Sequence, residues 1–252
     1  MTTRPLRRLA GAATLALLPL ALGGSFAPPA YVAAAVADPN RPAADVARDA
    51  ARKPVAMLAL AEVRPGETVV DWTPGGGYFT RLFSGAVGPQ GKVYAVTPGT
   101  FQRLHPPKGP PVSTEPGHGN VREIVSENDT ALPLSAPADL VWTAQNYHDI
   151  HVFFGGAEGA AAFDRAAFAA LRPGGRLVIV DHAGAAHLDE AGMTALHRID
   201  EALVIKEVTA AGFVLDAESQ ALRNSADDHS LAVFDPKIRG ETDQFALRFR
   251  KP

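Results

Sequence analysis

The sequence predicts an α/β domain built on a doubly wound, mostly parallel β-sheet. Short apolar segments with the composition of buried strands alternate with segments whose apolar residues recur at helical spacing. This alternation is typical of a parallel sheet whose strands are joined by helices. The predicted strands are apolar along nearly their whole length, which indicates that helices cover both faces of the sheet.

The predicted elements follow in chain order. Residues 45–61 read as two short helices, or as one helix kinked near Pro54, because proline interrupts a helix. Residues 98–120 are rich in proline where a crossover helix is expected, which favours a long loop that covers the crevice. The predicted strands lie at 68–72, 92–97, 121–125, 140–143, 176–181, 213–218 and 244–250. The remaining predicted helices lie at 78–85, 157–171 and 188–211.

The first 37 residues have the pattern of an export signal. Three arginines precede an apolar run at 9–22, and Ala35-Val36-Ala37 has the small-x-small pattern of a cleavage site. A membrane anchor is the alternative, but the run is short for a span of ~20 residues. A twin-arginine route also stays open, because Arg7 and Arg8 are adjacent. We therefore predict a signal peptide over 1–37, a linker over 38–44, one domain over 45–252, and a periplasmic or secreted location.

Composition excludes several classes of partner and chemistry. The net charge of the whole chain is −3, and loss of the three leader arginines would make it −6. An acidic protein has no general attraction to nucleic acid or to an anionic membrane, so we expect neither as a partner. The absence of cysteine excludes disulfides, thiolate nucleophiles and cysteine-based zinc sites. The oligomeric state is not predicted.

A glycine-rich turn is the most informative motif. Residues 69–80 read as an apolar strand containing Asp71, a turn with Gly75, Gly76 and Gly77, and a helix that starts at Tyr78. Glycine permits a tight turn and close approach of a ligand, and a helix start offers free N–H groups. The pattern predicts a binding site for a nucleotide-like ligand, although a plain strand–turn–helix junction would look similar.

This turn, the strand at 92–97 and the segment at 171–181 together resemble the class I S-adenosylmethionine (SAM) dependent methyltransferases. The resemblance implies a Rossmann-like fold closed by an antiparallel C-terminal hairpin, and SAM as cofactor. The tail from 197 to 252 is similar to a narrower group of exported bacterial proteins described as predicted methyltransferases. The family's first motif is acid-x-Gly-x-Gly-x-Gly. Asp71, Gly75 and Gly77 match it and Thr73 replaces the first glycine, so the resemblance implies that these residues, with Tyr78, hold the methionine end.

Two further positions of the resemblance concern the nucleoside. The second strand of the family should end in an acid that binds both ribose hydroxyls, but this chain has Thr97, which cannot chelate a diol. Asn128 and Asp129 precede Leu132-Pro133 at the spacing where the family contacts adenine. An Asx turn after a strand is the alternative interpretation of that pair.

Two His-Asp pairs follow two of the predicted strands. His148 and Asp149 come shortly after the strand at 140–143, and Asp181 and His182 end the strand at 176–181. Carboxyl ends of parallel strands share one edge, where open α/β folds bind ligands, so we expect the four side chains to converge. His197 and His229 could join them, the latter from a polar insert over 219–243 that would cover the crevice.

Three roles are open for these pairs: a general base, a divalent metal site, or polar groups that cap strand ends. We assign His148, Asp149, Asp181 and His182 as catalytic and assign no metal ligand, because no compact metal motif is present. The resulting hypothesis is SAM-dependent methyl transfer to a small molecule, with His148 or His182 as base. The alternative is an exported, non-catalytic or repurposed module of the same fold that binds another ligand.

Overall fold

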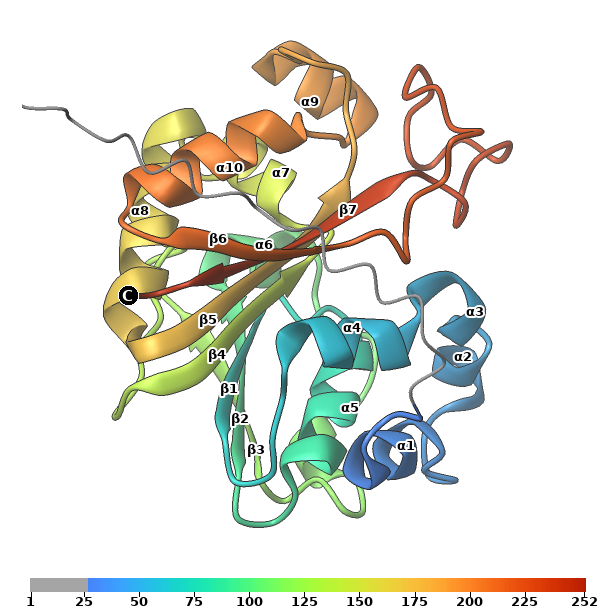
Figure 1. Ribbon diagram of the computed structural model, residues 1–252, viewed down its shortest axis with the longest axis vertical. Helices are drawn as coiled ribbons and strands as arrows, with labels where there is room; N and C mark the ends of the chain where they lie inside the picture. Colours follow the sequence, from blue (N-terminus) through green and yellow to red (C-terminus); the bar gives the residue numbers. More distant parts are fainter. Residues whose placement is uncertain (1–26) are drawn as a thin grey trace, which may run out of the picture.

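A seven-stranded β-sheet organises the molecule, and the computed structural model describes residues 27–252 (Figure 1). The predicted leader's residues 1–26 lie outside the described part of the chain. The strand order across the sheet is β3-β2-β1-β4-β5-β7-β6. The strands are β1 (Thr68–Trp72), β2 (Lys92–Pro98), β3 (Val121–Ser126), β4 (Ala138–Ala144), β5 (Leu171–His182), β6 (Val214–Ser219) and β7 (Gln244–Arg250).

Strand directions confirm the predicted fold class. The first five strands pair in parallel, whereas β7 runs antiparallel to both β5 and β6. The doubly wound, mostly parallel sheet and its antiparallel C-terminal hairpin are therefore as predicted. This is the strand arrangement that the resemblance to class I methyltransferases implies.

Helices cover both faces of the sheet. Helices α1 (Ala30–Val36), α4 (Pro54–Ala61) and α5 (Tyr78–Val87) lie on one face, and α7 (Tyr147–Phe153), α8 (Gly156–Ala170) and α10 (Glu201–Ala210) on the other (Figure 1). Successive residues of a strand point to opposite faces, so Val69 packs with the first group and Val70 with the second. The shorter elements are α2 (Ala43–Val46), α3 (Asp49–Arg52), α6 (Gly99–Leu104), a 3-10 turn at Val112–Thr114 and α9 (Glu190–Leu196).

Four helical details differ from the sequence predictions. The segment 45–61, expected as two short helices or one kinked helix, contains parts or all of three helices, α2, α3 and α4. The single helix expected over 188–211 is two helices, because His197 adopts a left-handed φ of 54° and Asp200 then caps α10 by accepting from the Ala202 N–H. The segment 98–120 is not loop throughout, since α6 forms before its run of prolines begins. Helix α7 was not predicted, and it carries two of the candidate residues.

The predicted leader boundary falls at the end of a packed helix. Helix α1 buries Val32 and Ala35 against the domain, and the Tyr31 hydroxyl donates to the Val63 carbonyl at 3.0 Å. The small-x-small sequence thus closes an element that contributes to the core. Within residues 27–252, no helix has the length and apolar character needed to cross a bilayer.

Candidate active site

The glycine-rich turn leaves the carboxyl end of β1 in a left-handed conformation. Thr73, Gly75 and Gly77 have φ values of 57°, 56° and 81°. Of these three left-handed residues only Thr73 carries a Cβ, so its backbone is strained in a way that a glycine at this position would not be. Its buried Oγ1 has no hydrogen-bond partner among the described residues. A Cβ added at Gly75 or Gly76 would meet no atom within 4 Å, so the turn faces open space.

Asp71 is buried directly beneath this turn. Its Oδ2 accepts a hydrogen bond from Thr80 Oγ1 at 2.6 Å, which ties the end of β1 to the first turns of α5. Burial disfavours the charged carboxylate and raises the pKa of Asp71 to about 7, against the smaller opposing effects of Thr80 and Arg52. The acid of the first motif therefore stabilises the turn by linking the two elements that flank it, β1 and α5.

Tyr78 begins α5 and anchors the N-terminal helices to the turn. Its hydroxyl donates to Asp49 Oδ1 at 2.7 Å, and the guanidinium of Arg52 lies 4.9 Å from its ring centroid. Burial, with Arg48 nearby, lowers the pKa of Arg52 to about 10. Sequence reasoning missed Asp49 and Arg52, because short helices before the first strand carry no motif.

The three residues predicted to contact the nucleoside, Thr97, Asn128 and Asp129, lie near the carboxyl ends of β2 and β3. Thr97 is half-buried near the end of β2 and has a hydroxyl where a carboxylate is expected. Asp129 accepts from the Thr100 N–H at 2.8 Å and from its Oγ1 at 2.6 Å, so its carboxylate lies at the start of α6, next to the end of β2. Asn128 accepts weakly from the Thr130 N–H at 3.2 Å, which is the Asx turn of the alternative interpretation. Both residues line a surface depression of about 370 Å³ beside Phe154.

The two His-Asp pairs converge at the ends of β4 and β5. His148 Nδ1 lies 2.8 Å from Asp181 Oδ1, and the His148 backbone N–H donates to Asp181 Oδ2 at 2.8 Å. The same carboxylate accepts from the His182 N–H at 2.7 Å. The ring centroids of His148 and His182 are 6.1 Å apart. Asp181 therefore holds both histidine segments in place.

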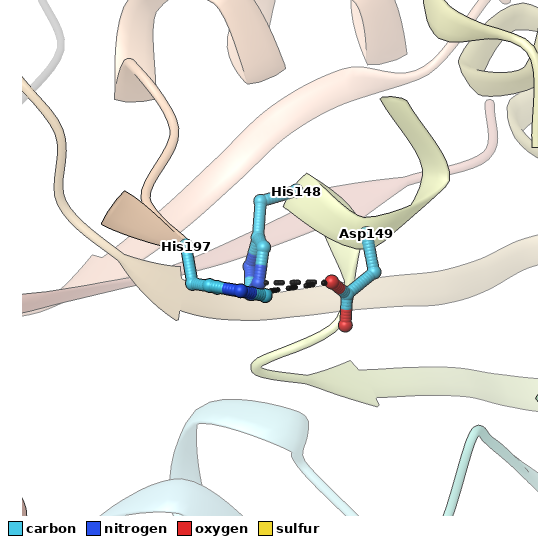
Figure 2. Close-up of side chains that lie close together, drawn as sticks. All are labelled: His148, Asp149 and His197. Carbon is cyan, nitrogen blue, oxygen red and sulfur yellow. Dashed lines mark ion pairs between the residues drawn. The ribbon is translucent and has the colours of Figure 1, made fainter. Parts of the chain in front are cut away.

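A third histidine joins this cluster from the end of α9. Figure 2 shows His148, Asp149 and His197 with their side chains turned toward one another. Asp149 Oδ1 lies 3.2 Å from His148 Nε2 and 3.7 Å from His197 Nδ1. Burial alone would lower the pKa of His148, but the carboxylates of Asp181 and Asp149 outweigh it and raise the pKa to about 10. Burial, with a contribution from charged His148, lowers the pKa of His197.

His182 has the opposite electrostatic environment. Burial is the main cause that lowers its pKa to about 4, so its ring is neutral at physiological pH. Its Nδ1 lies 2.8 Å from Thr242 Oγ1, which belongs to the polar insert. When Nδ1–H is the donor in that bond, the Nε2 lone pair is free to accept a proton.

The insert and the proline-rich segment contact different parts of the site. Phe234 of the insert packs against His197 with ring centroids 4.9 Å apart, and Thr242 contacts His182. His229 instead pairs with Asp243 at 3.0 Å within the insert. In the proline-rich segment, Val112 packs so close to Gly77 that a Cβ there would come within 2.5 Å of it. The insert thus covers the histidines, and the proline-rich segment supports the glycine turn.

Polar side chains connect the glycine turn to the histidines. Arg52 donates to Gln145 Oε1 at 2.8 Å, and Gln145 Nε2 donates to Gln244 Oε1 at 3.1 Å. Gln244 Nε2 lies 3.5 Å from Thr242 Oγ1, which contacts His182. Sequence reasoning found none of these connecting residues, because they lie far apart in the chain and have no distinctive spacing.

Solved structures confirm the fold. One is an arsenic(III) SAM methyltransferase from Chlamydomonas reinhardtii, 20% identical, with a TM-score of 0.51 over 89% of this chain and 74% of that one. Another is the cyclase SpnF, 16% identical, with a TM-score of 0.53 over 83% of this chain and 81% of that one. A third is Aeropyrum pernix fibrillarin, solved with natively bound SAM. It is 17% identical, with a TM-score of 0.50 over 80% of this chain and 76% of that one. No protein-family model matches the sequence, and no curated protein matches it either. The chain therefore has the fold of class I methyltransferases, at identities that establish the fold alone.

Proposed function

We propose that the chain is a SAM-dependent methyltransferase that acts on a small molecule. The observation that carries the proposal is the open glycine turn. Gly75 and Gly76 face free space at the end of β1, next to the strand end that leads to His148. An open α/β sheet binds its ligand at such an edge.

The residues around the turn fit SAM at its methionine end. Gly75 and Gly76 allow close approach of the ligand. Asp71 ties the end of β1 to α5 through Thr80, and Tyr78 ties the start of α5 to Asp49. Thr97 offers only one hydroxyl to a ribose. Asp129 is the carboxylate that lies beside this end of β2, and we assign it the ribose rather than adenine.

The histidine edge supplies the acid–base chemistry. SAM, when bound, supplies an electrophilic methyl group, and the protein must align the acceptor and take its proton. Both ring nitrogens of His148 lie next to carboxylates, whereas the ring of His182 makes one hydrogen bond among the described residues, between its Nδ1 and Thr242 Oγ1. We therefore assign His182 as the base and Asp181 as the group that positions its backbone.

Ligand titration tests the proposal directly. Calorimetric titration of the full chain with S-adenosylhomocysteine should give saturable but weak binding. Gly76→Leu should abolish it, because the new side chain fills the open space without a clash or a left-handed φ. Gly119→Leu is the matched control at the opposite end of the sheet, also in open space, and should bind normally.

A gain-of-function variant sharpens this test. Thr97→Asp should tighten binding by about 1.5–3 kcal/mol, which is about tenfold to a hundredfold, because a carboxylate can bind both ribose hydroxyls. If neither wild type nor Thr97→Asp binds at millimolar ligand, the proposal is wrong.

The specific observation favouring the alternative is the pair of threonines. Thr73 strains the turn and Thr97 replaces the ribose acid, and both changes suit a module repurposed for another ligand.

We also propose that the protein is exported and periplasmic or secreted. N-terminal sequencing of protein from a native-like host tests this, and a retained Met1 would count against it. Export would separate the protein from cytosolic SAM and so favour the alternative.

A further inference from the structure

Two adjacent side chains of α7, His148 and Asp149, meet His197 from the end of α9 at one point of the histidine edge. One ligand atom each from His148, Asp149 and His197 lies within 4.8 Å of the others (Figure 2). The two contacts made by Asp149 Oδ1 are 3.2 Å and 3.7 Å. Nitrogen and oxygen ligands about 2.0–2.2 Å from a shared ion would stand at comparable separations from one another.

The oxygen at the centre of this cluster has no hydrogen bond. Asp149 Oδ1 is buried and unpaired among the described residues, although two imidazole nitrogens are near it. The 3.2 Å approach of His148 Nε2 does not have hydrogen-bond geometry. Buried carboxylate oxygens normally accept a hydrogen bond, so an unpaired one calls for another partner. The three groups point to a common position rather than pairing with each other.

His148 is held in the orientation that a metal ligand needs. Its Nδ1 is 2.8 Å from Asp181 Oδ1, which leaves Nε2 toward Asp149 and His197. Asp181 is itself fixed by the backbone N–H groups of His148 and His182. A carboxylate behind a metal-binding histidine fixes the tautomer and strengthens the ligand.

The charges around the cluster favour a cation. The carboxylates of Asp149 and Asp181 both face His148. The neighbouring guanidinium of Arg198 is paired with Asp227 at 2.8 Å and with the Ala183 carbonyl at 2.9 Å, so it does not neutralise them. A bound cation would balance the two carboxylates.

We infer that His148 Nε2, Asp149 Oδ1 and His197 Nδ1 bind one divalent transition-metal ion, best matched by Zn²⁺. Two imidazoles and one carboxylate form the donor set of three-ligand zinc sites with an open fourth position, whereas Mg²⁺ and Ca²⁺ prefer oxygen ligands. The His197 side chain is 27% exposed, which gives the ion a route in. The ion and a proton would compete for His148 Nε2.

This inference does not depend on SAM binding, so it is tested with the metal alone. The untagged full chain is treated with a chelator, dialysed, and titrated with Zn²⁺ in competition with a chromogenic chelator. One ion should bind per chain. Asp149→Asn and His197→Asn should each lower the affinity at least tenfold. Asparagine suits the left-handed backbone at position 197, so that variant should keep its fold.

The matched control is His187→Asn. His187 is an exposed histidine that also has a left-handed φ, of 61°, but lies outside the cluster. Its substitution should leave the affinity unchanged. Asp181→Asn should weaken binding by about ten- to a hundredfold, as expected for a residue that positions a ligand.

Thermal unfolding provides a readout that needs no measured affinity. Zn²⁺ should raise the midpoint of wild type and His187→Asn but not that of His197→Asn, because only the native site binds the ion. The inference is overturned if wild type binds no Zn²⁺ saturably, if both cluster variants bind as wild type does, or if Mg²⁺ binds equally well.

Discussion

Asp71 should make the stability of this fold depend on pH in the neutral range. It is fully buried below the glycine turn, and its carboxylate accepts from Thr80 Oγ1. The perturbation is Asp71→Asn, which keeps the shape and an accepting oxygen but cannot ionise. Any pH-dependent difference between the two proteins then reports the carboxyl group itself.

The sign and size follow from the pKa. Burial raises the pKa of Asp71 from 3.8 to about 7, so the folded state holds the proton more tightly than the unfolded state. The buried Asp71 carboxyl therefore lowers the stability of wild type least below about pH 4. The free energy of unfolding of wild type falls as pH rises to about 7 and stays at the lower value above it. At about 1.4 kcal/mol per pKa unit, the full loss is about 4 kcal/mol, of which about 3 falls between pH 5 and 8.

Urea unfolding of both proteins at pH 5 and pH 8 measures this. The free energy of unfolding of Asp71→Asn minus that of wild type should be about 3 kcal/mol larger at pH 8 than at pH 5, because only wild type loses stability over this range. The control is Asp228→Asn, because hydrogen bonds from Ser230 lower the pKa of that exposed carboxyl below its ordinary value of 3.8. The Asp228 carboxyl is therefore ionised in both the folded and the unfolded state at pH 5 and pH 8, and the stability of Asp228→Asn relative to wild type should not change between them. A relative stability of Asp71→Asn that is flat or falls with pH would refute the reasoning.

Two further variants test the turn and the N-terminal helix. Thr73→Gly should stabilise the protein by about 1 kcal/mol in chemical denaturation, because glycine has no penalty at φ 57°, whereas Thr209→Gly within α10 should not stabilise. Destabilisation by Thr73→Gly would show that the threonine is not strained. A chain that begins at Asp38 should be about 3 kcal/mol less stable than one that begins at Ala27, because it loses the buried side chains of α1. Equal stability would mean that α1 contributes nothing to the core.

The sheet could be predicted because its signals are local. The segments 68–72 and 244–250 are short segments rich in apolar and aromatic residues, and the structure gives β1 and β7 the same bounds. Burial on both faces leaves few alternatives for such runs. The break between α9 and α10 could not be predicted, because it depends on His197 adopting a left-handed φ that no local residue dictates.

The candidate site could be predicted only in part. Topology alone brings the residues after β4 and β5 to one edge, so the meeting of His148 with His182 followed from strand order. Arg52, Gln145 and Thr242 were missed because nothing distinguishes them from ordinary polar residues until the fold places them together. The roles of the predicted binding residues remain predictions.

The opposite pKa shifts of His148 and His182 depend on the immediate partners of each ring, which the sequence does not reveal. His148 and His182 lie 6.1 Å apart and are both buried, yet the pKa of one is raised to about 10 and that of the other is lowered to about 4. The difference arises because two carboxylates face the ring of His148. The ring of His182 instead contacts the Thr242 hydroxyl, and it is the backbone N–H of His182 that donates to Asp181. A ring between two carboxylates is suited to bind a proton or a metal cation, whereas the ring of His182 stays neutral at physiological pH, which leaves the lone pair of its Nε2 unprotonated. The same residue type at one sheet edge is therefore held in two opposite electrostatic environments.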